Sequence, residues 1–148
     1  MNTHPYLRAY MAGTALPTMV MLLVLAGFVL GRFVFGIPVP IERMIVFPMA
    51  VVPNVFGAWN ILYLSLKGKR HLPIGLHGAL LPFLLAPAGY AVASGLGFLK
   101  LTSDGLVWFD SVRLNYGEFA IGFCVALGVY YLVWKYAVNF FNETLGIA

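Results

Sequence analysis

The placement of the charged residues constrains this chain most, because they gather in a few short clusters and leave long apolar segments between them. Only 9% of the 148 residues are charged and 61% are apolar, whereas a soluble domain carries roughly a quarter charged residues. A helix that crosses a bilayer needs about 20 predominantly apolar residues. The pattern therefore predicts an integral membrane protein that crosses the bilayer more than once.

We predict an all-α fold, a polytopic bundle of four transmembrane helices over residues 15–35, 43–66, 73–99 and 118–140. Residues 1–14 are interpreted as a polar and aromatic head. The first apolar run is longer than that of a signal peptide and no small-residue cleavage site follows it, so it is expected to remain as an anchor. The whole chain, 1–148, then forms a single transmembrane domain without a soluble domain on either side.

The connection over residues 100–117 is the longest polar one. It carries Trp108 and Phe109 between charged residues. Aromatic residues favour the depth of the lipid headgroups, so this connection is expected to lie flat at the membrane surface.

Small residues mark the helix faces that are expected to pack closely. Gly27 and Gly31 form a small-xxx-small pair in the first helix, a spacing that lets a second helix approach. A longer seam of small residues and proline runs along the third helix: Gly75, Gly78, Pro82, Ala86, Gly89, Ala93 and Gly97. We expect this seam to form the packing core of the bundle.

The turn after the second helix is strongly basic and sets the predicted orientation. Lys67, Lys69 and Arg70 lie within four residues, and short loops rich in Lys and Arg stay on the cytoplasmic side. Both termini are then cytoplasmic, and the expected location is a bacterial inner membrane. The same cations are candidates for binding anionic lipid headgroups or an acidic partner, although fixing the topology explains them fully.

Polar side chains inside the second helix are the candidate functional groups within the bilayer. Asn54, Ala58 and Ser65 form one weakly polar stripe, and the adjacent stripe contains Asn60. Two interpretations stay open. The asparagines line a conduit in an oligomer, or they join neighbouring helices through hydrogen bonds, each worth about 0.6 kcal/mol on average.

His77 lies one turn inside the third helix between small residues, with room beside it for a flat macrocycle. Axial ligation of haem or chlorophyll is one hypothesis for this residue. A histidine hydrogen-bonded to a carbonyl near the interface is the other. No cofactor is assigned from the sequence.

The remaining residues give no support for catalysis. Glu42, Asp104, Asp110 and Glu118 fall on one predicted side but match no ligand motif, and we interpret them as solvated charges. The single cysteine, Cys124, excludes an internal disulfide. A net charge of +4 without an Arg-rich face gives no reason to expect nucleic acid as a partner.

No acidic residue is expected at the bilayer midplane, which disfavours an ion-coupled transporter. The leading hypothesis is a non-catalytic membrane subunit or scaffold that assembles with itself or with other membrane subunits. The alternative is a small oligomeric channel or passive facilitator lined by Asn54 and Asn60. A pigment-binding subunit that uses His77 is a weaker alternative.

Overall fold

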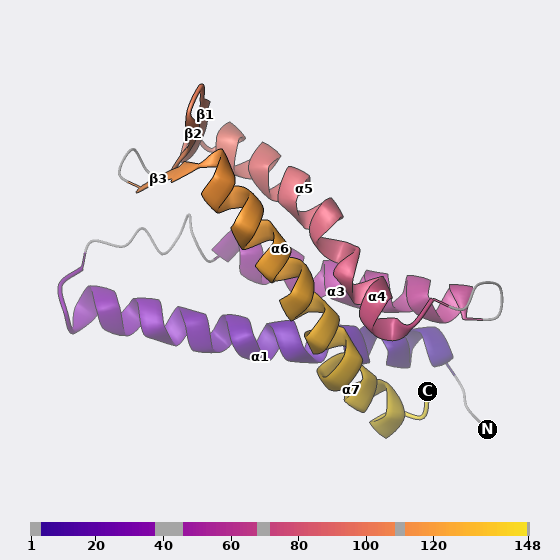
Figure 1. The fold of residues 1–148 in the computed structure, drawn as a ribbon. Coiled ribbons are helices and arrows are strands. Elements are labelled where there is room, and N and C mark those ends of the chain that lie inside the picture. Colours follow the sequence, from indigo (N-terminus) through magenta and orange to yellow (C-terminus); the bar gives the residue numbers. More distant parts are fainter. Residues whose placement is uncertain (1–3, 38–45, 68–71, 109–111, 148) are drawn as a thin grey trace. The chain divides into compact units, whose positions relative to one another are not determined.

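The computed structural model describes residues 4–37, 46–67, 72–108 and 112–147. In chain order the elements are α1 (Pro5–Phe33), α3 (Val46–Leu66), α4 (Ile74–Ala79), α5 (Leu81–Gly95), β1 (Leu99–Thr102), β2 (Gly105–Trp108), β3 (Val112–Asn115), α6 (Tyr116–Leu132), the π-helix η1 (Val133–Val138) and α7 (Asn139–Thr144) (Figure 1).

Four helical stretches in the described part of the chain are long and apolar enough to cross a membrane. They cover Pro5–Phe33, Pro48–Leu66, Ile74–Gly95 and Tyr116–Thr144. The prediction of a mainly helical chain with four membrane-length helices is confirmed at this level. The contacts divide the chain into two compact units, Met1–Leu72 with Tyr136–Ala148, and Pro73–Lys135. We call them unit 1 and unit 2 and describe each by itself.

Unit 1 is built on the packing of α1 against α3, with α7 against α1. The buried residues of α1 are Ala9, Ala12, Gly13 and Pro17, which recur at helical spacing on one face. Their small side chains bring the two helix backbones close together. On α3 the buried face contains Phe56, Gly57 and Asn60.

The first helix begins ten residues earlier than expected, at Pro5 rather than at residue 15. Proline suits the first position of a helix because its missing N–H needs no partner there. No residue between Pro5 and Phe33 ends the helix, and it continues through Pro17. The prediction of a separate polar head was wrong, because Tyr6 and Arg8 are polar side chains on a continuous helix.

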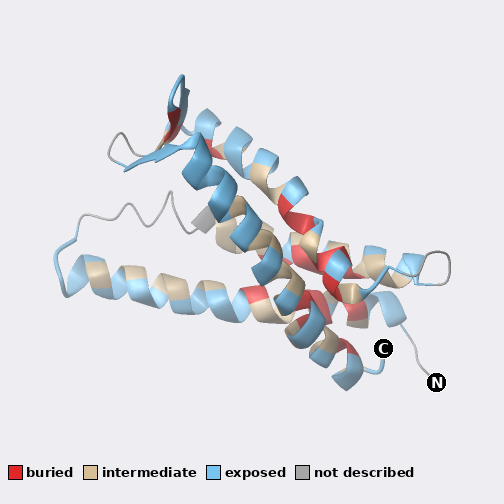
Figure 2. Cartoon of the chain, viewed as in Figure 1, coloured by how far each residue is buried: buried red, intermediate tan, exposed pale blue. Residues whose placement is uncertain are grey.

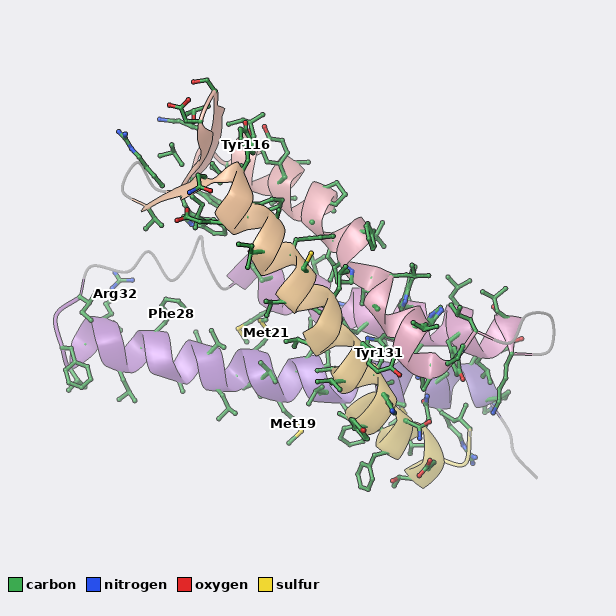
Figure 3. The ribbon with its side chains drawn as sticks, viewed as in Figure 1. Met19, Met21, Phe28, Arg32, Tyr116 and Tyr131 are labelled. Atoms are coloured by element: carbon green, nitrogen blue, oxygen red, sulfur yellow. The ribbon has the colours of Figure 1, made fainter. Side chains whose placement is uncertain are left out.

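The first half of α1 is the half that packs within unit 1. No residue of α1 after Pro17 is buried, and Figure 2 shows that half in the colours of intermediate and exposed residues. Met19 and Phe28 extend from the helix in different directions (Figure 3). A Cβ added at Gly27 or Gly31 would meet nothing within 4 Å. The close helix contact therefore forms at Gly13 and Gly57, not at the predicted pair.

Unit 2 contains α4, α5, the sheet and α6, with both α4 and α5 packed against α6. The predicted third helix, 73–99, is divided at Leu80 into α4 and α5 and ends at Gly95. Pro82 explains the division, because proline has no N–H to donate to the preceding helical turn. The small-residue seam packs only in part: Gly75 and Gly78 contact aromatic rings of α6 and η1, while Gly89 and Gly97 meet nothing within 4 Å.

The end of α5 turns the chain directly into a β-sheet. Gly97 has a φ of 78°, and its N–H donates to Ser94 O at 3.0 Å while the N–H of Phe98 donates to Ala93 O at 3.1 Å. These two bonds form a Schellman motif, in which glycine is favoured in the left-handed conformation. Phe98 packs back onto Ala93, which fixes the exit of the chain.

The three strands form an antiparallel sheet in the order β1-β2-β3. The all-α prediction was wrong at this point, because the connection between the third and fourth predicted helices contains β-strands. Gly105 sits where β2 meets β3 so closely that an added Cβ would lie 2.1 Å from Leu114 O. The strand signal was present as alternation of apolar and polar residues in β1 and β3, but the segments are only four residues long.

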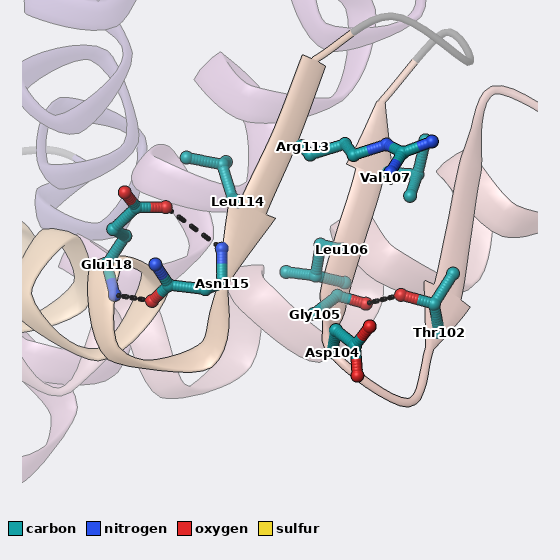
Figure 4. A pocket seen from close by; sticks show the side chains of 9 residues that line it. All are labelled: Thr102, Asp104, Gly105, Leu106, Val107, Arg113, Leu114, Asn115 and Glu118. Carbon is teal, nitrogen blue, oxygen red and sulfur yellow. Dashed lines mark hydrogen bonds between the residues drawn. The ribbon is translucent and has the colours of Figure 1, made fainter.

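The last span begins at Tyr116 rather than at residue 118 and continues to Thr144. Asn115 and Glu118 form a capping box at its start: Asn115 Oδ1 accepts from Glu118 N at 2.8 Å, and Glu118 Oε2 accepts from Asn115 N at 2.9 Å (Figure 4). The predicted end of this span at residue 140 was too early, because α7 continues it to Thr144.

Candidate functional site

A buried cluster of amide groups lies at the centre of unit 1. Asn60 is 1% exposed and Asn142 is 3% exposed. Asn60 Nδ2 donates to Asn142 Oδ1 at 2.7 Å and to Ala9 O at 2.8 Å, and Asn142 Nδ2 donates back to Asn60 Oδ1 at 3.2 Å. The cluster therefore joins α1, α3 and α7 through side chains that have no charge.

The cluster depends on the tight contact between α1 and α3. A Cβ on Gly13 would lie 2.6 Å from Phe56 O and 2.9 Å from the Cα of Gly57. A Cβ on Gly57 would lie 2.6 Å from the ring of Tyr10. Because both positions lack a side chain, the Asn60 amide reaches the carbonyl of Ala9 across the contact.

The stripe of α3 that contains Asn54, Ala58 and Ser65 is exposed. Asn54 Nδ2 donates to Ala50 O at 2.5 Å, and Tyr10 donates to Asn54 Oδ1. Ser65 Oγ donates to Leu62 O at 2.8 Å, within its own helix. The structure thus separates the two asparagines: Asn60 is enclosed in unit 1 and Asn54 lies on its outside.

Basic residues from two segments meet the chain's final turn in unit 1. Arg8 Nη1 donates to Leu145 O at 3.3 Å, and Lys67 Nζ donates to Ile147 O at 3.4 Å. The start of α1, the end of α3 and the end of α7 therefore lie at one end of unit 1. The other two cations of the predicted basic turn, Lys69 and Arg70, lie outside the described residues.

His77 is 3% exposed and lies in unit 2. Its ring meets the ring of Trp134 edge-on, with centroids 5.6 Å apart and an angle of 68° between the planes. A Cβ on Gly78 would lie 2.0 Å from Trp134 Cγ, and one on Gly75 would lie 2.7 Å from Tyr131 Cε2. Aromatic side chains therefore occupy the space that the small neighbours of His77 leave open.

A shallow hollow of about 470 Å³ lies on the sheet of unit 2. It contains the side chains of Asp104, Arg113 and Glu118 (Figure 4). Glu118 is engaged in the capping box, which gives it a structural role. Among the described residues no group of three or more His, Cys, Asp and Glu side chains is placed to hold a metal ion. Glu42 and Asp110 lie outside the described residues.

The sequence-based interpretation missed Asn142 as a partner of Asn60. A signal was available, because Asn142 follows an apolar run without a helix-breaking residue and sits among aromatic residues. Asn142 was left outside the predicted helix because that helix was ended at residue 140. Tyr10 was missed for the equivalent reason at the other end of the chain.

Comparison with known proteins adds no assignment. No protein-family model matches the chain, and no curated protein or solved structure matches it either.

Proposed function

We propose that this chain is a non-catalytic integral membrane subunit that assembles with itself or with other membrane subunits. The observation that supports this proposal is the uncovered surface of its spans. In the most apolar part of each span, the buried share is only 11% for Pro5–Phe33, 22% for Pro48–Leu66, 28% for Ile74–Gly95 and 11% for Tyr116–Thr144. The chain covers little of its own apolar surface, which leaves that surface for lipid and for other helices.

The second half of α1 is the best candidate for contact with another subunit. Its Gly27 and Gly31 have open space above them, and small residues at this spacing let a partner helix approach its backbone. The buried polar groups of unit 1, Asn60 and Asn142, are by contrast used for internal packing. We therefore place the assembly surface on the glycine-containing face of residues 19–33.

We further propose that both termini are cytoplasmic in a bacterial inner membrane. Arg8 and Lys67 lie at the same end of unit 1, and Lys69 and Arg70 follow Lys67 directly in the sequence. A short segment with this density of cations favours the cytoplasmic side. Anionic lipid headgroups are the proposed partners of these cations, at about 1 kcal/mol for each cation near the surface.

A channel or passive facilitator is the second candidate, and the exposure of Asn54 favours it. Asn54 and Ser65 lie on the exposed stripe of α3, where copies of the chain in a ring would present them to a common axis. Asn60 is unsuited to this role while its amide bonds to Asn142 and Ala9. Pigment ligation by His77 has less support, because Trp134 and Tyr131 would have to move.

Purification of the untagged full chain in mild detergent tests the subunit proposal. If the chain is a subunit, it should purify as a defined complex. The double variant Gly27→Leu, Gly31→Leu should then dissociate into a smaller species. Val29→Leu, an exposed change on the same helix, serves as the matched control and should leave the complex intact.

Reconstitution into liposomes tests the second candidate. Solute flux that disappears in Asn54→Leu and persists in Ser94→Ala would support the channel and count against a purely structural subunit. A Soret or Qy absorption band that is lost in His77→Ala would support the pigment hypothesis. A chain that stays monomeric at membrane-like concentrations contradicts the subunit proposal.

A further inference from the structure

The sheet of unit 2 has two faces of opposite character. Alternate residues of a strand point to opposite faces, and directly paired residues share a face. The strand pairs Leu101↔Leu106 and Leu106↔Leu114, with Leu99↔Trp108 and Trp108↔Val112, put six apolar side chains on one face. The other face carries the residues between them: Lys100, Thr102, Gly105, Val107, Arg113 and Asn115.

Most of the apolar face is not covered within the chain. Leu99 and Leu106 are buried, but Leu101 is 58% exposed, Val112 is 55% exposed, and Trp108 and Leu114 are each 37% exposed. Scattered apolar residues on a surface are ordinary, but four neighbours on one small face form a continuous apolar patch. The patch is what remains after the sheet has packed onto its helix.

The same face is turned toward the end of a membrane-length helix. Ala93 of α5 and Phe98 pack on Leu99 and Leu106, and the Phe98 and Trp108 rings lie 6.2 Å apart. The apolar face is therefore the one that closes over the end of α5. The polar face, with Lys100 and Arg113 on either side of Val107, points the other way.

The sheet is held at this position from both of its ends. The Schellman turn at Gly97 joins it to α5, and the capping box at Asn115 joins it to α6. In addition, Tyr116 Oη donates to Thr102 O at 2.7 Å, which links the start of α6 to β1. A sheet tied directly to the ends of two spans lies at the depth where those spans leave the hydrocarbon.

We propose that this sheet is an interfacial plate whose apolar face inserts into the headgroup and acyl-chain boundary of the bilayer that α5 and α6 cross. The occupant of the patch is lipid. At the start of α6, which follows the sheet directly, Tyr116 and Phe119 are also exposed apolar side chains. Trp108 adds the amphipathic ring that favours headgroup depth. Lys100 and Arg113 keep their charges toward water, as in interfacial amphipathic elements.

This proposal is independent of whether the protein is a subunit or a channel, since it concerns only how unit 2 meets the bilayer. It predicts that the two faces of the sheet lie in different environments. Neighbouring residues in one strand, such as Leu101 and Thr102, must report different environments. A segment that lies in the water outside the bilayer would show no such alternation.

Single-cysteine labelling of the full chain in phosphatidylcholine and phosphatidylglycerol vesicles tests this difference between the two faces. In a Cys124→Ser background, Leu101→Cys and Leu114→Cys report the apolar face, and Thr102→Cys and Arg113→Cys are the matched controls. Each is labelled with an environment-sensitive fluorophore and quenched either by iodide in the water or by lipids that carry a spin label near the headgroup.

The proposal expects several-fold stronger quenching by the spin-labelled lipid at the two apolar-face positions, and several-fold stronger quenching by iodide at the two controls. Equal iodide quenching at all four positions would overturn it. Cross-linking between chains through Leu101→Cys or Leu114→Cys, with protection from both quenchers, would also overturn it, because a second copy would then cover the patch. Elution of each variant at the volume of the parent chain shows that the comparison is made on folded protein.

Discussion

Asn60 and Asn142 are 82 positions apart and exchange amide hydrogen bonds in both directions, at 2.7 and 3.2 Å. A third bond joins Asn60 to the main chain of α1 at Ala9. Every amide group in this cluster is therefore paired with another uncharged group. Burial of such groups is tolerated in a membrane protein because the partners replace the water that the bilayer lacks.

Substitution of Asn142 by leucine should destabilise the protein by about 1–2 kcal/mol, because it leaves the buried Asn60 amide without that partner. Unfolding of purified protein in mixed micelles measures the effect. Asn139→Leu is the control, since Asn139 Nδ2 donates to Glu143 Oε1 in an exposed bond within the same helix. In a double-mutant cycle, the Asn60→Leu, Asn142→Leu variant should lose less stability than the two single losses added together. Strict additivity would show that the pair is not coupled.

Alanine at Gly13 should destabilise the packing of α1 on α3 by about 1–3 kcal/mol, the usual cost of overpacking a close contact. The new Cβ would meet the Phe56 carbonyl oxygen at 2.6 Å, and a backbone oxygen cannot move away as a side chain can. Gly27→Ala, with nothing within 4 Å of the added Cβ, should not destabilise the detergent-solubilised monomer and should gain up to about 1 kcal/mol from helix propensity. Equal stability of the two variants would contradict the position assigned to the helix contact.

Gly78→Ala tests the aromatic packing in unit 2. Its Cβ would overlap Trp134, with the nearest ring carbon at 2.0 Å, so the Trp134 side chain has to shift. We expect a red shift of tryptophan fluorescence and a stability loss of about 1–3 kcal/mol. Gly89→Ala, which has open space, should change neither quantity. An unchanged emission spectrum in Gly78→Ala would show that Trp134 does not fill this space.

Two substitutions of Glu118 test whether its carboxylate has a structural or a functional role. As part of the capping box, Glu118→Ala should cost about 1 kcal/mol, whereas Glu118→Gln should cost much less because an amide oxygen still accepts from Asn115 N–H. Thermal unfolding followed by circular dichroism provides the comparison. If the charge itself were required, for example to bind a cation, glutamine and alanine would behave alike.

The membrane-length helices were predictable because the gaps between charge clusters are about as long as a bilayer is thick. Their ends were less predictable, because apolarity does not mark where a helix stops. Residues 5–14 remain helical although they contain Arg8 and two tyrosines, since Pro5 starts the helix and no glycine or proline pair interrupts it. Asn142 stays helical for the same reason until Gly146 turns the chain at a φ of 67°.

The sheet was missed for a different physical reason. Four-residue strands carry too few alternations to separate them from an irregular loop, and they depend on their register with one another. The turn at Gly97 and the capping box at Asn115 hold the two ends of the sheet, but neither one by itself identifies the residues between them as strands. The buried face of α3, in contrast, was visible as the stripe that contains Gly57 and Asn60, although the partner helices were not.

Unit 1 combines segments that lie before and after unit 2 in the sequence, so it is completed only after unit 2 has been synthesised. Its helices α1 and α3 leave the ribosome early, whereas α7 is made after all of unit 2. Until α7 arrives, the Asn60 side chain must stay in the nascent protein without its Asn142 bond. The Asn60–Asn142 hydrogen bonds therefore form only after α7 has been translated, and until then water or another polar group must pair with the Asn60 amide.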